Sequence, residues 1–404
     1  MNLPKNALKR FIQLLLLIPV LCVLQFNWSL YYVPFCENGV NKDVLKQLKH
    51  LENSIKNDKI DFENQHLFPE GYFFTNVLYG LAWADLLKSV DKQNPIFQKG
   101  VSEIKWSISK LNSNDGRGIF SSKTPLPFGA FYNGWLTYLV GNYLQVAGVQ
   151  NADSELLHFF ENQCAIIQLA MSKTDLPYLE TYIGQVWPAD NILCVASLSL
   201  HDLLTTPQYK STIFAWMQRI KLHLDAKTGM IPHVYSVRKN EGVGEVRGSS
   251  QSLMLCFLPA IDSVFAREQF DLYKKMFIQN KLGLSAVREF PLNTEGSGDV
   301  DSGPIIWDVG PVASVVGVKA MAENHDFELY TSIRNTIEAF GFSSENADFK
   351  HYLFNKLPIA DAFIAWTNAR NCDFSESQQR IFQWKFHLVC LLVLVPFCWW
   401  VYKL

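Results

Sequence analysis

The sequence of 404 residues lacks an excess of charge of either sign. It contains 36 Lys and Arg residues against 38 Asp and Glu residues, and no long run of like charges occurs along the chain. Proteins that bind nucleic acid through its phosphates carry a basic patch or stripe, which this pattern does not provide. We therefore expect no nucleic-acid partner.

The eight cysteines lack the spacing of a metal or redox site. No Cys-x-x-Cys pair and no cluster of Cys with His is present, although such clusters are typical of bound zinc. Three cysteines (Cys22, Cys390 and Cys398) lie in terminal apolar runs and the others are scattered, which argues against a disulfide framework. We expect neither a metal nor another cofactor.

Alternation of polar and apolar residues, typical of half-buried strands, is also missing over any convincing length. Only the segment 231–246 could form a hairpin, within a loop. Amphipathic or wholly apolar runs with helical periodicity fill the interior instead, and they predict about twelve helices. These runs are 40–55, 72–88, 96–111, 131–146, 154–171, 190–203, 209–224, 249–263, 266–280, 303–322, 327–340 and 359–369.

Long apolar runs are present at both ends of the chain. The run 11–35 follows Lys9 and Arg10, and the run 386–402 contains no charge and ends in aromatic residues. Each is long enough to span a bilayer of about 30 Å, with an aromatic belt at the interface. A cleaved signal peptide would begin similarly, but no small-residue cleavage site follows Leu24, so we favour an uncleaved anchor.

Two spans place both termini on the same side of the membrane. Lys5, Lys9 and Arg10 favour a cytoplasmic N-terminus, although basic residues such as Lys42 and Lys46 on the opposite flank weaken this bias. We predict a two-pass protein of the cell membrane, in contact with the lipid bilayer, with its central domain on the exported side.

The connections between the predicted helices alternate in length. Short turns such as 148–151 and 205–208 alternate with loops that begin near residues 112, 173, 226, 283 and 341. Helices that follow the long loops start near residues 72, 131, 190, 249, 305 and 359, at intervals of roughly 54 to 59 residues, which indicates six repeats of one helical hairpin. All the long loops then share one face, where function is expected.

The first helix of each repeat is the more apolar, which indicates an inner ring of buried helices. The last one, 359–369, needs a partner, which 40–55 supplies by closing the ring. The predicted fold class is therefore all-α, an (α/α)6 toroid of six helical hairpins flanked by N- and C-terminal transmembrane helices. Residues 1–36 form the anchor, 37–372 the toroid, and 373–404 a linker and the C-terminal transmembrane helix.

Three loop segments lead into inner helices: Trp187 to Asn191, Arg247 to Ser250, and Gly298 to Pro304. With these segments and its alternating connections, the chain resembles the six-hairpin-glycosidase-like (α/α)6 superfamily over about residues 40–370. The resemblance implies a fold and a site at the mouth, the end where the inner helices begin. It transfers no catalytic residue, and members of the superfamily include hydrolases, lyases, epimerases and a terpene dehydratase-isomerase.

Carboxylates in the long loops are the candidates for catalysis. Glycoside hydrolysis needs one carboxylic acid to protonate the leaving oxygen and a second carboxylate to activate water or attack the sugar. Asp190 with Asp301, or Glu180 with Asp299, could supply such a pair across the mouth. We assign the acid to Asp301, with a raised pKa, and the base to Asp190. Asp190 could also be only a helix cap, and Asp299 with Asp301 only part of a cation site.

Aromatic and polar residues near the same face are the candidates for substrate binding: Tyr132, Trp135, Trp187, His233, Tyr235, Arg247 and Asp308. These types stack on sugar rings and donate or accept hydrogen bonds. The favoured function is a membrane-anchored carbohydrate-active enzyme, a glycoside hydrolase or lyase acting on a glycan.

Two other function classes stay open. Cys194 and Cys256 fall within the first turns of successive inner helices, so with His233 and Tyr235 they could serve a dehydratase or isomerase acting on an apolar alcohol. A non-catalytic protein of the envelope that binds a glycan or lipid is the third hypothesis.

Overall fold

The computed structural model describes residues 5–369 and 382–403, and these residues are mostly helical. The predicted boundary at residues 372 and 373 lies outside them. The helices are α1 (Lys5–Ser29), α2 (Lys42–Lys56), α3 (Ile60–Leu67), α4 (Gly71–Leu87), α5 (Pro95–Leu111), α6 (Asn114–Arg117), α7 (Gly129–Ala147), α8 (Ser154–Ser172), α9 (Pro188–Leu204), α10 (Lys210–Leu222), α11 (Gly248–Leu255), α12 (Ser263–Phe277), α13 (Pro311–Glu323), α14 (Phe327–Phe340), α15 (Pro358–Asn368) and α16 (Trp384–Lys403).

Short antiparallel β-hairpins lie in the connections between these helices. They pair β1 (Cys36–Glu37) with β2 (Val40–Asn41), β3 (Val234–Ser236) with β4 (Glu241–Val243), β5 (Ile278–Lys281) with β6 (Leu284–Val287), and β7 (Ser344–Glu345) with β8 (Lys350–His351). The hairpin predicted within 231–246 is therefore confirmed, whereas β5–β6 was not predicted.

Most predicted helices occur within a few residues of their predicted ends, and three differ for local reasons. The run 249–263 is helical only to Leu255, because Pro259 lacks the N–H that a continuing helix needs. The run 266–280 gives way to β5 after Phe277. The helix predicted from residue 303 begins only at Pro311, since Trp307 and Asp308 have positive φ angles that no α-helix accepts.

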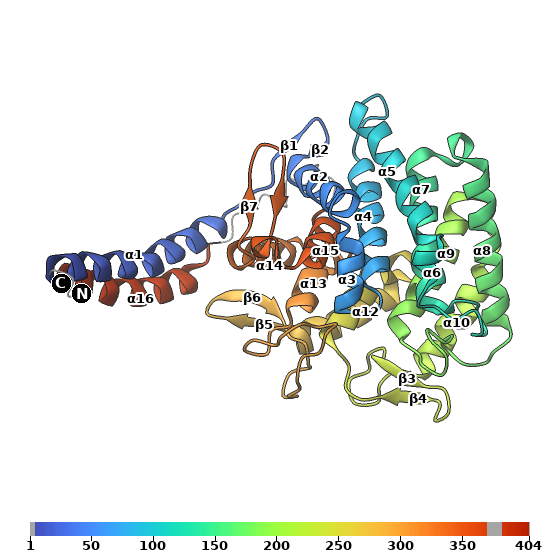
Figure 1. The fold of residues 1–404 in the computed structure, drawn as a ribbon. Helices are drawn as coiled ribbons and strands as arrows, with labels where there is room; N and C mark the ends of the chain where they lie inside the picture. The colour runs from blue at the N-terminus through green and yellow to red at the C-terminus, as the bar shows by residue number, and fades with distance from the viewer. Residues whose placement is uncertain (1–4, 370–381, 404) are drawn as a thin grey trace.

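The helices predicted to open each repeat contact one another in a cyclic order. These six, called the inner helices below after that prediction, are α4, α7, α9, α11, α13 and α15, and each contacts the next, with α15 contacting α4 in turn. Each also packs on a second, more polar helix, which for α15 is α2. The helix expected as the distant partner of 359–369 thus lies beside it (Figure 1).

An aromatic cluster fills the centre of the domain. Trp135 of α7, Phe257 just after α11 and Trp366 of α15 are buried, and their ring centroids lie 5.9 to 6.1 Å apart. Such pairs contribute about 0.5–1.5 kcal/mol each beyond the burial of their area. Because the three rings come from alternate inner helices, their size sets the spacing of those helices around the centre.

A buried ion pair joins the C-terminal parts of α4 and α13. The Lys319 ammonium lies 2.8 Å from Asp85 Oδ2 and 5.3 Å from the centroid of Trp366. Lys88 donates to the other oxygen of Asp85 at 2.6 Å. Burial would raise the pKa of Asp85, but the charges of Lys319 and Lys88 hold it below its usual value.

The two terminal helices form a stem. Each is long and apolar enough to cross a membrane, and Figure 1 shows α1 and α16 side by side, projecting from the domain, with the start of α1 beside the end of α16. His387 joins them near the domain, since its ring nitrogens lie 2.5 Å from the hydroxyl of Tyr31 and 2.5 Å from Asn27 Oδ1. Polar side chains of this kind hold membrane helices together.

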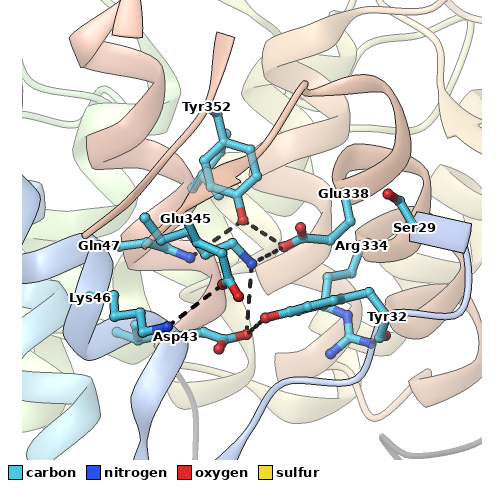
Figure 2. A network of polar contacts seen from close by, with 12 residues as sticks. Ser29, Tyr32, Asp43, Lys46, Gln47, Arg334, Glu338, Glu345 and Tyr352 are labelled. Atoms are coloured by element: carbon cyan, nitrogen blue, oxygen red, sulfur yellow. Dashed lines mark hydrogen bonds and ion pairs between the residues drawn. The ribbon is translucent and has the colours of Figure 1, made fainter. Parts of the chain in front are cut away.

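A buried network of charges binds the base of the stem to the domain (Figure 2). Tyr32, which follows α1, donates a hydrogen bond to Asp43 of α2. Lys350 of β8 lies 3.7 Å from Asp43 and 3.0 Å from Glu338 of α14, and Tyr352 donates to Glu338 at 2.5 Å. Because a buried pair that loses one partner leaves an uncompensated charge, this junction resists separation.

We expect Trp135→Ala to lower the free energy of unfolding by about 3–5 kcal/mol, because it empties the centre of the domain. The measurement is urea unfolding of the full chain in detergent micelles. Trp307→Ala is the matched control, since Trp307 is 67 % exposed and its loss should change stability by less than about 0.5 kcal/mol. Equal effects of the two substitutions would contradict the central role of Trp135.

Candidate functional site

The loops that precede the inner helices meet at one end of the domain, the mouth. Backbone hydrogen bonds connect three of the helix starts to a neighbouring segment: Ala130 N–H donates to the Glu180 carbonyl at 2.9 Å, Gly248 N–H to that of Glu289 at 2.8 Å, and Gly310 N–H to that of Val287 at 2.9 Å. The first of these contacts requires Gly129, because a Cβ there would lie 1.9 Å from the Thr181 carbonyl oxygen.

Asp190 lies in the first turn of α9 and is buried at the mouth. The Thr181 hydroxyl donates to its Oδ2 at 2.9 Å and itself accepts from the Trp187 N–H at 3.2 Å. Burial raises the pKa of Asp190 to about 7; the Thr181 hydrogen bond opposes the shift, whereas the charges of Glu70 and Asp301 add to it. Asp190 therefore carries a proton for much of the time at neutral pH.

Tyr182 and Glu70 stand beside Asp190. The hydroxyl of Tyr182 donates a hydrogen bond to the carboxylate of Glu70, the residue before α4, and its ring meets Trp187 edge-on at 5.8 Å. The pKa of Tyr182 is raised by burial, by Glu70 and then by the charges of Asp190 and Asp301. These side chains thus share one electrostatic environment, although they come from different loops.

Asp301 lies on the solvent side of this group and is exposed. Enclosure by the surrounding protein is the largest cause of its raised pKa, followed by the charges of Asp299 and Glu70, while Arg247 acts in the opposite direction. Among the described residues, no ion pair connects Glu70, Asp190 or Asp301 to a Lys or Arg side chain. Three acidic groups therefore share the mouth without a cation of their own, which favours retention of a proton.

Arg247, in contrast, pairs with two other carboxylates. Its Nε lies 2.8 Å from Glu289 Oε1, its guanidinium also binds Asp299, and its charge lies over the ring of Phe290. Burial alone would raise the pKa of Asp299, but Arg247 and the Ser302 N–H lower it to about 2. Asp299 is therefore ionised and serves as the counter-ion of Arg247.

Glu289 is the most deeply buried of these acids. Ser249 Oγ donates to its Oε1 at 2.7 Å, while its Oε2 has no hydrogen-bond partner among the described residues. Burial raises its pKa against the opposing effects of Ser249 and Arg247. Gly310 leaves room for Oε2, because a Cβ there would lie 2.7 Å from it.

His233 completes the group near α11. Its Nδ1 lies 2.6 Å from Ser250 Oγ, and burial, followed by the charge of Arg247, lowers its pKa to about 4. The imidazole is therefore neutral at physiological pH and offers a hydrogen bond rather than a charge.

The mouth thus gathers Asp190, Asp299, Asp301, Trp187, His233 and Arg247 from the residues predicted for the site, and it adds Glu70, Tyr182 and Glu289. Glu70 could have been suggested by its place, immediately before the first inner helix, as Trp187 and Arg247 immediately precede theirs. It follows a short connection from α3, so loop length gave no indication of it.

The other predicted residues lie in different surroundings. Trp135 belongs to the central aromatic cluster. The hydroxyl of Tyr132 accepts from Arg117 Nε at 3.0 Å, and the hydroxyl of Tyr235 donates to Asn240 at 2.5 Å. Both tyrosines are buried, and these bonds hold their own loops in place.

Asp308 and Glu180 also make contacts apart from the mouth carboxylates. Asp308 accepts from Lys281 at 3.0 Å and from Arg288 at 3.1 Å, beside the β5–β6 hairpin. Glu180 is connected through its backbone carbonyl, which receives the Ala130 N–H.

The two cysteines of the isomerase hypothesis are buried. Cys194 donates to the Ala130 carbonyl at 3.4 Å and Cys256 to the Ser252 carbonyl at 3.2 Å, and burial raises both thiol pKa values. A reactive cysteine needs a lowered pKa, so neither thiol is activated. Within residues 5–369 and 382–403, no group of three or more His, Cys, Asp or Glu side chains is placed to hold a metal ion.

Comparison of the chain with protein-family models and with curated proteins finds no match. The class that its own geometry defines is a mostly helical protein with two apolar terminal helices and a carboxylate-rich mouth.

We expect Asp190→Asn to change how stability depends on pH. The pKa of Asp190 is about 7 in the fold against 3.8 ordinarily, so the stability it provides is complete below pH 4 and is lost as the pH rises to 7. The amide cannot ionise and still accepts from Thr181. The variant should therefore match the wild type at pH 4 and exceed it at pH 8, by up to about 4 kcal/mol.

The measurement is the unfolding temperature in detergent between pH 4 and 8. Asp308→Asn is a control for which stability should change in the opposite direction. The hydrogen bond from Lys281 lowers the pKa of Asp308, so replacement of its carboxylate by an amide should reduce stability above pH 4. A curve for Asp190→Asn that runs parallel to the wild type would refute the raised pKa.

Proposed function

We propose that this protein is a membrane-anchored carbohydrate-active enzyme, a glycoside hydrolase or lyase, whose central domain is an (α/α)6 toroid. The cyclic order of contacts among the inner helices supports the toroid, because each inner helix meets the next and α15 returns to α4. The position of α2 beside α15 supports six hairpins rather than five.

The observation that carries the function is the burial of Asp190 beside Glu70 and Asp301, which raises its pKa to about 7; among the described residues, none of the three forms an ion pair with Lys or Arg. A general acid must hold a proton at working pH, and a nearby carboxylate must stay ionised as the base. Asp190 is buried whereas Asp301 is exposed to water, which stabilises an ionised carboxylate, so Asp190 is the acid and Asp301 the base, the reverse of the assignment from sequence. Asp299, already neutralised by Arg247, positions that arginine.

In a hydrolase, Asp190 protonates the leaving glycosidic oxygen while Asp301 takes a proton from the attacking water. In a lyase, Asp301 removes the proton from the carbon next to a uronate carboxylate, and Asp190 again protonates the leaving oxygen. The half-buried rings of Tyr182 and Trp187 supply an apolar face against which a sugar can stack.

The proposal places the central domain on the exported side of the membrane. Lys9 and Arg10 at the start of the first span favour a cytoplasmic N-terminus. Cys36, just outside that span, is disulfide-bonded, and disulfides persist in oxidising compartments. The other described cysteines, among them Cys22 and Cys164, are free.

We expect Asp190→Asn and Asp301→Asn each to reduce turnover by about 10²–10⁴-fold, because each removes one of two proton-transfer groups. The assay uses the full chain in detergent with a panel of neutral and uronate-containing polysaccharides. New reducing ends report hydrolysis or elimination, and ultraviolet absorbance of an unsaturated product identifies a lyase.

Asp361→Asn is the matched control. Burial raises the pKa of Asp361, in the first turn of α15, to about 7 as well, but its partner is the backbone N–H of Tyr352 and the charges of Glu70, Asp190 and Asp301 do not contribute to its shift. The control should keep full activity. Glycan binding without turnover in the wild type would favour the non-catalytic hypothesis, and equal activity of all variants would exclude these carboxylates from catalysis.

We also expect both chain ends to be cytoplasmic. A fluorescent reporter that matures only in the cytoplasm should be fluorescent at either terminus in a bacterial host, whereas a phosphatase active only after export should be active when fused after Val149. The opposite pattern of the two reporters would reverse the topology.

A further inference from the structure

Exposed apolar side chains surround the point where the stem leaves the domain. Four of them are Leu282, Trp307, Phe342 and Phe354, which are 49 %, 67 %, 43 % and 65 % exposed. Single exposed apolar residues are ordinary on protein surfaces, so their position relative to the stem is what needs explanation.

Two contacts connect this surface to the stem, one made by Phe342 itself and one by the neighbour of Leu282. Phe342 meets Phe26 of α1 edge-on at 6.0 Å and stacks on Phe354 at 4.9 Å. Leu282 is at the turn of the β5–β6 hairpin, whose next residue, Gly283, packs so closely on α16 that a Cβ there would lie 2.7 Å from Lys385 Cβ. These contacts fall at the domain-proximal ends of α1 and α16, where a spanning helix meets the interface.

Trp307 extends the same surface away from the stem. Its carbonyl accepts from Gln279 of β5 at 3.3 Å, and its ring points to solvent. In Figure 1 the β5–β6 hairpin extends from the domain on the side of the stem, while α8 and α10 lie on the opposite side.

We propose that Leu282, Trp307, Phe342 and Phe354 form a collar that rests in the interfacial region of the lipid bilayer. Aromatic and leucine side chains favour that region, where apolar rings are shielded and backbone groups stay hydrated. The surface is continuous with the two spanning helices, so lipid is the partner that necessarily lies next to it once those helices are inserted. The collar depends on insertion of the stem and not on the proposed chemistry at the mouth.

The experiment places a photoreactive benzophenone amino acid at single positions of the full chain in nanodiscs of phosphatidylcholine and phosphatidylglycerol with alkyne-tagged acyl chains. After illumination, tagged lipid bound to the protein is quantified. Phe354 is matched by Phe214 of α10, which is 66 % exposed, and Leu282 by Leu169 of α8, which is 50 % exposed.

The collar predicts lipid adducts at Phe354 and Leu282 several-fold above those at Phe214 and Leu169. Equal yields at the paired positions would overturn it, as would cross-links from Phe354 and Leu282 to a second copy of the chain in place of lipid. All four positions are exposed, and unchanged unfolding temperatures of the variants establish that they are folded.

Discussion

The packing of three aromatic rings at the centre of the domain is the constraint on which the remaining structure depends. Trp135, Phe257 and Trp366 belong to α7, the end of α11 and α15, so they fix the distances between alternate inner helices. The starts of those helices, and the loops that precede them, are positioned in consequence. Acidic residues from loops far apart in sequence are brought together because the helices that carry them cannot move apart.

Electrostatics then divides the mouth into two parts. Arg247 neutralises Glu289 and Asp299 and holds the latter ionised. Asp190 and Asp301 stand beside Glu70 with no such partner among the residues that the structure describes, so the least costly arrangement keeps a proton among them. One arginine thus determines which acids are structural and which remain available for proton transfer.

Much of the helical content could be predicted from the sequence, because apolar periodicity is set by burial within each helix. The predicted range 327–340 coincides with α14. Local backbone conformation was harder to predict from the sequence. The start of α13 shows this, because it comes later than predicted, after Trp307 and Asp308 in the left-handed conformation. The β5–β6 hairpin forms against α16 and α14, so its cause lies in tertiary contacts that a local pattern does not contain.

Some of the candidate site residues could likewise be predicted from the sequence, and others depended on tertiary contacts. Asp190 and Asp301 could be found because loop length predicts a shared face, whereas Glu70 follows a short connection. Trp135 and Trp187 are alike in type and in closeness to a helix start, yet one packs at the centre and the other at the mouth. The proton assignment depends on depth of burial, which residue type alone does not reveal.

The ion pair of Lys319 and Asp85, beneath the ring of Trp366, affects how a ligand can enter and leave the domain. The buried rings of Trp135, Phe257 and Trp366 fill the centre of the proposed toroid, so it is a packed core and not a channel. A molecule that reaches Asp190 must arrive and depart by the same route. Departure of one molecule therefore has to precede the arrival of the next.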